Sequence, residues 1–248
     1  MVQEARIDAG LDPTDLRPVL SRFGRLHLPG LLTPDTAAAW HGSLAGSKAW
    51  RRALHAGGGR DVDIPVDELE ELPAAERERI ERLAHQNAGD ELRYLFDAIR
   101  IDDELSKGRG VDPALEAVWR FLNGPEFLSF VRRLTGDEQC AYVSAMATRY
   151  LPGHFLTAHH DEAPGEERLY AYVLNLTARW RADWGGLLLF LDDEDHVEEG
   201  YVPAWNALNI FRVPARHAVS MVAPFARTPR LSITGWIRSA PPPWTQAR

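Results

Sequence analysis

Three side chains of this sequence are of types that bind transition metals, and two of them are separated by a single residue. His159 and Asp161 form a His-x-Asp pair, and His217 follows further along the chain. In an extended segment, side chains two residues apart leave the backbone on the same side, so both can reach one ion. Two imidazoles and one carboxylate can occupy one face of the ion and leave the opposite face open. We therefore expect these three residues to bind a metal.

The sequence also contains two competing pairs of similar type: His160-x-Glu162 and His196-x-Glu198. Alternation points His160 away from the side chains on either side of it. The other pair lies in an acidic run over residues 192–199, which is typical of an exposed loop. A β-like run leads into His159, so these surroundings favour the first pair over its competitors. The ordinary alternative to metal binding is that His159 is a surface histidine beside a turn aspartate. For His217, the alternative is a buried histidine without a metal.

A strand-like segment near the end of the chain carries a basic residue on its polar face. Alternation places Arg230, Ser232 and Thr234 on one side of this segment and apolar residues on the other. A buried arginine requires an anionic partner. A guanidinium with a hydroxyl two residues away suits a ligand carboxylate. An ion pair with Asp183 or Glu199 is the structural alternative.

The residues beyond Cys140 predict a series of short strands separated by turns. The expected strands are Tyr142–Tyr150, Leu169–Leu176, Leu187–Leu191, Leu208–Val213, Ala218–Val222 and Leu231–Ile237. Short strands at such spacing are typical of a sandwich or jelly roll. These strands would hold the candidate metal and carboxylate residues together.

The preceding half of the sequence predicts mainly helices. Thr33-Pro34-Asp35 is a helix start that should end by Gly46, and further helices are expected over 73–101, after Asp112-Pro113 and after Pro125. The helical prediction over 73–101 includes an apolar stripe at Leu92, Leu95, Phe96 and Ile99. A short strand is expected at 61–64, and Gly57-Gly58-Gly59 should form a loop tip. We expect one α+β domain over 1–248, with helical support over 1–138 and the sheet core over 139–238.

Composition limits the classes of partner. The chain has 248 residues, 45% of them hydrophobic, and a net charge of −8. This charge argues against direct binding of nucleic acid but is compatible with a basic peptide. One cysteine, no signal-peptide core and no apolar run long enough to span a membrane indicate a cytoplasmic protein without a membrane partner. Oligomeric state is not predicted.

With these motifs in order, the sequence resembles the Fe(II)/2-oxoglutarate-dependent dioxygenases, and within them the prolyl-hydroxylase branch and the catalytic domain of ribosomal-protein prolyl hydroxylases. The matching segments are Tyr150, Phe155-Leu156-Thr157-Ala158-His159-His160-Asp161, Trp180, Gly185-Gly186-Leu187, Pro203-Ala204-Trp205-Asn206-Ala207-Leu208 and Arg230-Leu231-Ser232-Ile233-Thr234-Gly235-Trp236. They span about residues 140–238. The resemblance implies a double-stranded β-helix, or jelly-roll, core with the N-terminal helices packed on an outer face.

The resemblance also implies a cofactor set and a role for each site residue. His159, Asp161 and His217 would bind Fe(II), and Arg230 with Ser232 would bind the far carboxylate of 2-oxoglutarate. Tyr150 matches a position that approaches this co-substrate. Asn175 stands where many relatives have a co-substrate tyrosine. O2 is the second co-substrate, and ascorbate is a further expected stimulant.

Hydroxylation of a prolyl or other residue in a protein or peptide, with release of succinate and CO2, is the expected activity. A ribosomal protein is one expected substrate, although the eukaryotic relatives carry a second barrel for which this chain has no room. A free amino acid or small metabolite is an alternative substrate. A non-catalytic jelly roll that binds metal or ligand is the third interpretation.

Overall fold

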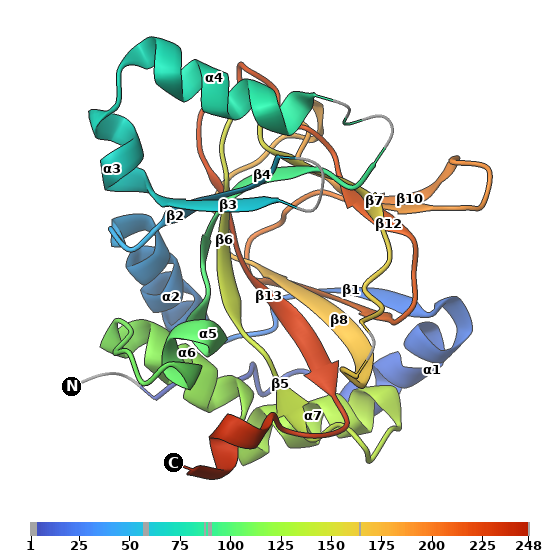
Figure 1. The fold of residues 1–248 in the computed structure, drawn as a ribbon. Coiled ribbons are helices and arrows are strands. Elements are labelled where there is room, and N and C mark those ends of the chain that lie inside the picture. Colours follow the sequence, from blue (N-terminus) through green and yellow to red (C-terminus); the bar gives the residue numbers. More distant parts are fainter. Residues whose placement is uncertain (1–3, 57–59, 87, 89–90, 164, 248) are drawn as a thin grey trace.

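Thirteen strands in the described part of the chain form one antiparallel sheet, which curls into a nearly closed barrel (Figure 1). The computed structural model describes residues 4–56, 60–86, 88, 91–163 and 165–247. The strands are β1 (Arg25–Pro29), β2 (Arg51–His55), β3 (Asp61–Pro65), β4 (Tyr94–Ile99), β5 (Tyr142–Val143), β6 (Met146–Tyr150), β7 (Phe155–His159), β8 (Arg168–Asn175), β9 (Leu188–Leu191), β10 (Val197–Tyr201), β11 (Ala207–Arg212), β12 (His217–Val219) and β13 (Arg230–Arg238). The jelly-roll prediction is thereby confirmed.

The order of strands across the sheet differs from their order in the sequence. It is β1-β11-β8-β13-β6-β4-β7-β12-β9-β10, with β2 paired to β3 and β4, and β5 paired to β13. The last long strand, β13, therefore lies between β8 and β6. This crossover places residues near the end of the chain beside residues about 80 positions earlier, as in the Ser232–Thr148 pair.

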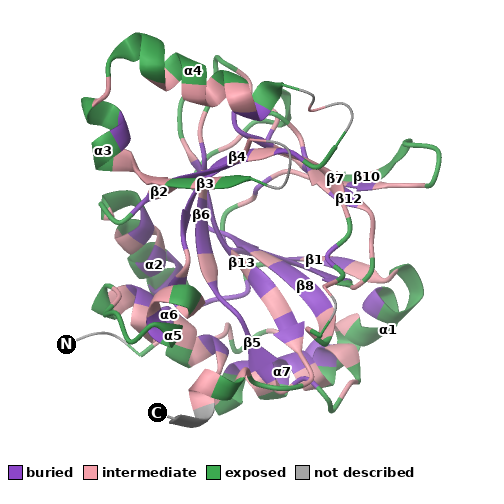
Figure 2. Ribbon diagram, in the orientation of Figure 1, coloured by how far each residue is buried: buried purple, intermediate pink, exposed green. Residues whose placement is uncertain are grey.

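Seven helices in the described part of the chain pack against the outside of the barrel. They are α1 (Pro13–Phe23), α2 (Pro34–Gly46), α3 (Val66–Glu71), α4 (Ala74–His85), α5 (Ile101–Ser106), α6 (Pro113–Leu122) and α7 (Pro125–Thr135), with short 3-10 turns at Ala182–Trp184 and Pro243–Ala247. Figure 1 shows α1, α2, α6 and α7 on one side of the barrel and α4 on the other. The largest buried cluster joins α2, α6 and α7 to β8 and β13 (Figure 2). None of these helices has the length and apolar character needed to cross a bilayer.

The helix boundaries follow local capping signals. The Asp112 carboxylate accepts a 2.8 Å hydrogen bond from the Ala114 amide at the start of α6, and Pro113 occupies the first helical position. At the end of α7, Gly136 adopts a φ of 73°, in the left-handed region that favours glycine. Pro34 likewise begins α2. The predicted helices at 34–46, 113–122 and 125–135 are confirmed.

The predicted helix over 73–101 is correct only for α4, and its extension through 92–99 is wrong. Residues 94–99 form β4, which pairs with β2, β6 and β7. The spacing of Leu95, Phe96 and Ile99 fitted a helical stripe, but the other residues of this segment also have buried or half-buried positions between strands. Pairing with distant strands has overridden local helical character here.

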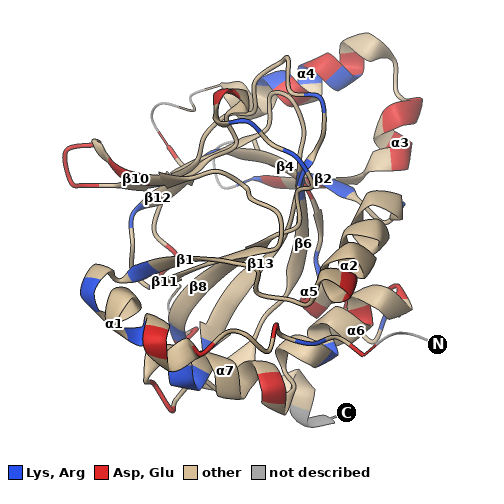
Figure 3. Ribbon diagram, turned by 180° about the vertical axis from the view of Figure 1, so that it is seen from behind, with Lys and Arg blue, Asp and Glu red and all other residues tan. Residues whose placement is uncertain are grey.

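Other strands were also absent from the sequence prediction. β1 and β2 come from the half expected to be helical support, so that half supplies four strands of the barrel. The acidic run 192–199 ends in β10, which pairs with β9 and was expected to be loop; the turn of this hairpin carries acidic residues (Figure 3). Gly57-Gly58-Gly59 lies outside the described residues. A single domain over 1–248 remains a prediction.

Candidate active site

Two neighbouring strands position the three candidate metal ligands. His159 ends β7 and is directly opposite His217 at the start of β12, with their ring centroids 4.2 Å apart. Asp161 follows β7 by two residues, and its carboxylate oxygens lie 3.6 Å from His159 Nε2 and 3.5 Å from His217 Nε2. One ligand atom from each residue lies within 4.8 Å of the other two. The sequence prediction that these side chains lie together is therefore supported.

Backbone hydrogen bonds orient both imidazoles. His159 Nδ1 lies 2.9 Å from the Thr157 carbonyl oxygen, and His217 Nδ1 lies 2.9 Å from the Ala215 carbonyl oxygen. Because a carbonyl can only accept, each Nδ1 carries a proton, and in the neutral form of each ring Nε2 presents its lone pair. Both Nε2 atoms face Asp161, which is the orientation that a shared metal ion requires.

Burial and mutual proximity affect the charges of this group. Burial, together with the neighbouring His159, lowers the pKa of His217 to about 4. Burial would raise the pKa of Asp161, but the adjacent imidazoles outweigh it and hold that pKa below its ordinary value. At neutral pH the group therefore has a neutral His217 and an ionised carboxylate, the protonation states needed to bind a cation.

The three residues open onto a cavity of about 310 Å³ inside the barrel, and Arg230 lines the same cavity. Arg230 is 2% exposed, and its Nε and Nη1 atoms have no hydrogen-bond partner among the described residues. Neither expected alternative partner is available, because Asp183 pairs with Arg181 and Glu199 pairs with Arg25. A buried guanidinium whose nitrogen atoms lack hydrogen-bond partners suits an anionic ligand in the cavity.

Side chains beside Arg230 complete this end of the cavity. Its guanidinium carbon lies 4.8 Å from the centre of the Tyr150 ring. Ser232 and Thr148 pair across β13 and β6, with their hydroxyl oxygens 2.8 Å apart. Arg230, Ser232 and Tyr150 all line the cavity, as predicted. Burial raises the pKa of Tyr150 to about 12, so its hydroxyl is a neutral hydrogen-bonding group.

Asn175 is the one predicted site residue that does not line this cavity. It ends β8 opposite Ser232 and is completely buried. Its Nδ2 lies 3.4 Å from the Ala207 carbonyl oxygen, and its Oδ1 has no partner among the described residues. Its contact with the co-substrate therefore remains a prediction.

The competing histidine pairs are not part of a comparable group. Within the described ranges, His159, Asp161 and His217 are the only cluster of three or more side chains that could hold a metal ion. His160 lies at the cavity wall but is exposed, and His196 is 75% exposed beside Asp192. The preference for the first pair is supported by this arrangement.

Several cavity residues were not singled out from the sequence. Tyr94 and Phe96 of β4 form one wall, and their alternation with Leu95 and Asp97 was the signal that could have identified them. Arg168 also lines the cavity and donates a hydrogen bond to the backbone carbonyl of Asp161. Trp236 lies beside it as part of the same wall.

A curled antiparallel sheet with two histidines, one carboxylate and a buried arginine around one cavity defines a non-haem iron type of oxygenase site. Residues 145–238 match the family model of the 2OG-Fe(II) oxygenase superfamily, so this part of the chain is similar to that superfamily. The matched range contains all three candidate metal ligands as well as Arg230 and Ser232. The family resemblance predicted from the sequence is confirmed.

Comparison with individual proteins places the chain near prolyl hydroxylases. It is 30% identical over 132 residues to prolyl 3-hydroxylase OGFOD1 of Mus musculus, a match that covers 50% of this chain and 24% of the mouse protein. The chain thus spans about a quarter of that relative's length. A prolyl-4-hydroxylase of Pseudomonas putida has a TM-score of 0.56 at 17% identity, covering 91% of this chain and 98% of that one.

A second solved structure supports the same fold. A 2OG-Fe(II) oxygenase family oxidoreductase of Burkholderia pseudomallei has a TM-score of 0.60 at 15% identity, covering 95% of this chain and 94% of that one. At these identities the likeness concerns the fold. The chemistry of this chain depends on the side chains of its own cavity.

Proposed function

We propose that this protein is an Fe(II)- and 2-oxoglutarate-dependent dioxygenase that hydroxylates a prolyl residue in a protein or peptide. The observation that carries the proposal is one cavity that holds both the His159/Asp161/His217 group and the buried, unpartnered Arg230. The donor set suits Fe(II), and the unpartnered cation suits a carboxylate of the co-substrate. Neither feature alone would indicate this reaction.

Each side chain has a task in this reaction. His159, Asp161 and His217 would hold the metal ion, and their backbone hydrogen bonds keep Nε2 of both histidines directed to it. Arg230 would bind the far carboxylate of 2-oxoglutarate, with the hydroxyl of Ser232 beside it. Bound Fe(II), 2-oxoglutarate and O2 supply the oxidising chemistry, with succinate and CO2 as co-products. Tyr150 would orient the co-substrate, and Phe96 lines the same cavity.

The prolyl substrate rests on the similarity to prolyl 3-hydroxylase OGFOD1. A ribosomal protein is the first substrate to test, because the sequence resembles the prolyl hydroxylases of ribosomal proteins. We further propose stimulation by ascorbate and a cytoplasmic location. A free amino acid or small metabolite is the competing substrate class.

Turnover without a prime substrate tests the chemistry. Purified protein supplied with Fe(II), 2-oxoglutarate and O2 should form succinate slowly, and the Arg230→Gln variant should do so only at much higher 2-oxoglutarate concentrations. If the metal-loaded protein neither binds 2-oxoglutarate nor forms succinate, the proposal is wrong. Mass spectrometry of ribosomal proteins from deletion and wild-type cells would then identify any protein that loses the mass of one oxygen atom in the deletion.

A further inference from the structure

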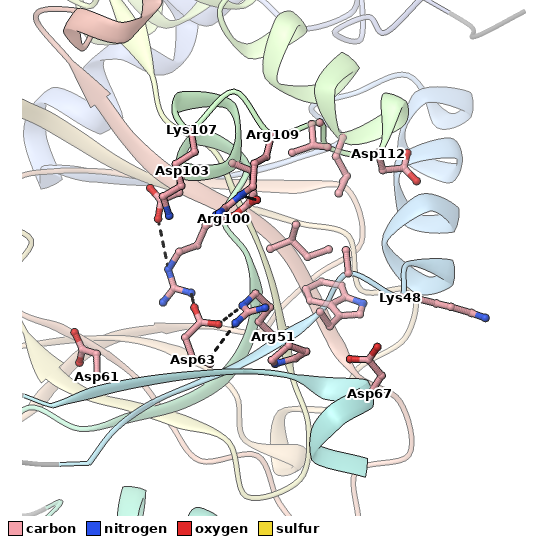
Figure 4. A pocket seen from close by; sticks show the side chains of 18 of the residues that line it. Lys48, Arg51, Asp61, Asp63, Asp67, Arg100, Asp103, Lys107, Arg109 and Asp112 are labelled. Atoms are coloured by element: carbon pink, nitrogen blue, oxygen red, sulfur yellow. Dashed lines mark hydrogen bonds and ion pairs between the residues drawn. The ribbon is translucent and has the colours of Figure 1, made fainter. Parts of the chain in front are cut away.

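A groove on the outside of the barrel is larger than the metal cavity. This outer groove has a volume of about 870 Å³ and lies between the β2–β3 hairpin, α5 and the start of α6 (Figure 4). Residues from all three elements line it, among them Arg51 and Asp63 of the hairpin, Glu104 of α5 and Leu115 of α6, together with Gly110 between the two helices. The function proposed above assigns it no task.

A third hollow adjoins both the outer groove and the metal cavity. This antechamber, of about 260 Å³, shares Tyr94, Phe96, Met146 and Trp236 with the metal cavity. It shares Arg100 and Asp103 with the outer groove. The three hollows therefore adjoin one another in series, from the metal group to the outer surface.

The strand β4 indicates the scale of the separation between the metal cavity and the outer groove. Tyr94 at its start lines the metal cavity, and Ile99 at its end lines the outer groove. Five steps along a strand cover roughly 17 Å, which is also the length of about five residues of extended polypeptide. A free amino acid in the metal cavity would not reach the outer groove, whereas a polypeptide would.

The wall of the outer groove contains a polar group that needs an acceptor. Trp50 is 2% exposed and lines the groove, and its indole Nε1 has no partner among the described residues. A buried N–H without an acceptor is costly, and the carbonyl groups of a polypeptide backbone are suitable acceptors. The apolar side chains of Val62, Val111 and Leu115 line the same groove and offer contact surface for side chains.

The charges of the groove also suit a polypeptide better than a polyanion. Asp63 forms ion pairs with both Arg51 and Arg100, which joins the β2–β3 hairpin to the end of β4 (Figure 4). Glu104 pairs with Arg109 at 2.5 Å on the opposite wall. Charges of both signs are thus paired within the groove, so no single-sign field is available to attract phosphate.

We propose that the outer groove binds the segment of a polypeptide substrate that lies about five residues from the residue oxidised in the metal cavity. This inference rests on the proposed function, because it takes the metal cavity as the place of oxidation. It selects a polypeptide over a free amino acid as the substrate class. It also assigns recognition to Trp50 and the α5–α6 connection, away from the metal.

A large side chain at Gly110 should block the outer groove and leave the metal cavity unchanged. A Cβ at this position would meet no atom within 4 Å and its φ is not in the left-handed region, so Gly110→Trp fits without backbone strain. Gly42→Trp is the matched control, because Gly42 is exposed on α2, also has open space at its Cβ and does not line the groove. Both variants should retain the wild-type rate of succinate formation without substrate.

The probe is a pool of thirteen-residue peptides with one central proline, from which oxidised members are identified by a mass gain of one oxygen atom. Truncating an oxidised peptide to two residues on each side of the proline should raise its KM at least about tenfold. Gly110→Trp should raise the KM of the long peptide to that of the short one, and Gly42→Trp should not. Trp50→Phe should raise the KM of the long peptide several-fold.

A chemical readout complements the kinetics. The only cysteine, Cys140, is buried, so Gly110→Cys introduces the only exposed thiol. The peptides carry a cysteine activated as a mixed disulfide with 2-nitro-5-thiobenzoate, so the Gly110→Cys thiolate forms the new disulfide by exchange and releases the nitrothiobenzoate. Peptides with this cysteine four to six residues from the proline should react faster than peptides with it next to the proline.

Several outcomes would overturn the inference. These are equal KM values for long and short peptides, equal effects of the two tryptophan variants, or disulfide formation that does not depend on cysteine position. A pool without any oxidised member, or a change of oligomeric state in Gly110→Trp without a change of KM, would also count against it. In each case, metal-dependent succinate formation by the wild type would leave the proposed function intact.

Discussion

The guanidinium carbon of Arg168 lies 3.6 Å from the centre of the Trp236 ring, at the wall of the metal cavity. The same guanidinium donates a 2.9 Å hydrogen bond to the backbone carbonyl of Asp161 and pairs with Glu166 at 2.8 Å. Arg168 therefore holds the segment that carries a candidate metal ligand against the end of β13. Side chains that support metal ligands in this way contribute substantially to metal affinity.

Replacing Arg168 should weaken metal binding without removing any ligand. We expect Arg168→Gln to lower the affinity for Mn(II), measured by titration calorimetry with 2-oxoglutarate present, by about tenfold. Arg181→Gln is the control, because Arg181 is exposed and pairs only with Asp183 among the described residues. Equal affinities for Arg168→Gln and the wild type would contradict a positioning role.

Removing a candidate metal ligand should have a larger effect. His217→Ala and Asp161→Ala should each reduce Mn(II) affinity by about a hundredfold or more, because an ion held by three protein groups loses one of them. His160→Ala should change it less than about twofold, since His160 is adjacent in sequence but exposed and outside the metal group. A strong loss of metal in His160→Ala would mean that the ligands have been assigned incorrectly.

Arg230 should affect the co-substrate and not the metal. We expect Arg230→Gln to raise the Kd for 2-oxoglutarate by about a hundredfold, because a buried charged partner of the carboxylate would be lost. Binding of Mn(II) alone should be unchanged. The exposed Arg212 on β11 provides the control substitution Arg212→Gln. The prediction fails if succinate and 2-oxoglutarate bind the variant as tightly as the wild type.

Acid should destabilise the fold partly through His154. Burial lowers the pKa of His154 to about 3 from an ordinary value of 6.5, so the unfolded chain takes up a proton there first. This contribution to stability is present above pH 6.5 and decreases as pH falls toward 3, by up to about 1.4 kcal/mol per pH unit. Urea unfolding at pH 7 and pH 5 should show a smaller difference for His154→Phe than for the wild type.

A buried ion pair joins the strands of the outer wall, and breaking it should destabilise the protein. Asp97 on β4 is completely buried and pairs with Arg52 on β2 at 2.5 Å and Arg149 on β6 at 2.7 Å. Asp97→Asn should cost about 3 kcal/mol in the free energy of unfolding, because the half-buried Arg149 loses its carboxylate partner and the buried Arg52 keeps only Glu81. Glu78→Gln, which alters an exposed pair on α4, should cost less than about 0.5 kcal/mol.

The sequence predicted structure that depends on neighbouring residues better than structure that depends on distant ones. Helix starts at Pro34, Pro113 and Pro125 could be predicted because a cap and a proline act within one turn of the chain. The assignment of residues 94–99 failed because β4 is defined by pairing with three distant strands. Such pairings leave little signal in the segment itself.

The candidate site shows the same division. Alternation along one strand was enough to place Arg230 with Ser232 on a polar face, and the single residue between His159 and Asp161 was enough to suggest a shared ion. Since these relations depend only on the geometry of an extended backbone, the sequence by itself determined them. Only the tertiary structure decided that His217 lies opposite His159, that β4 forms a cavity wall and that Asn175 stays outside it. Strand order and register depend on packing of the whole barrel, which no short segment encodes.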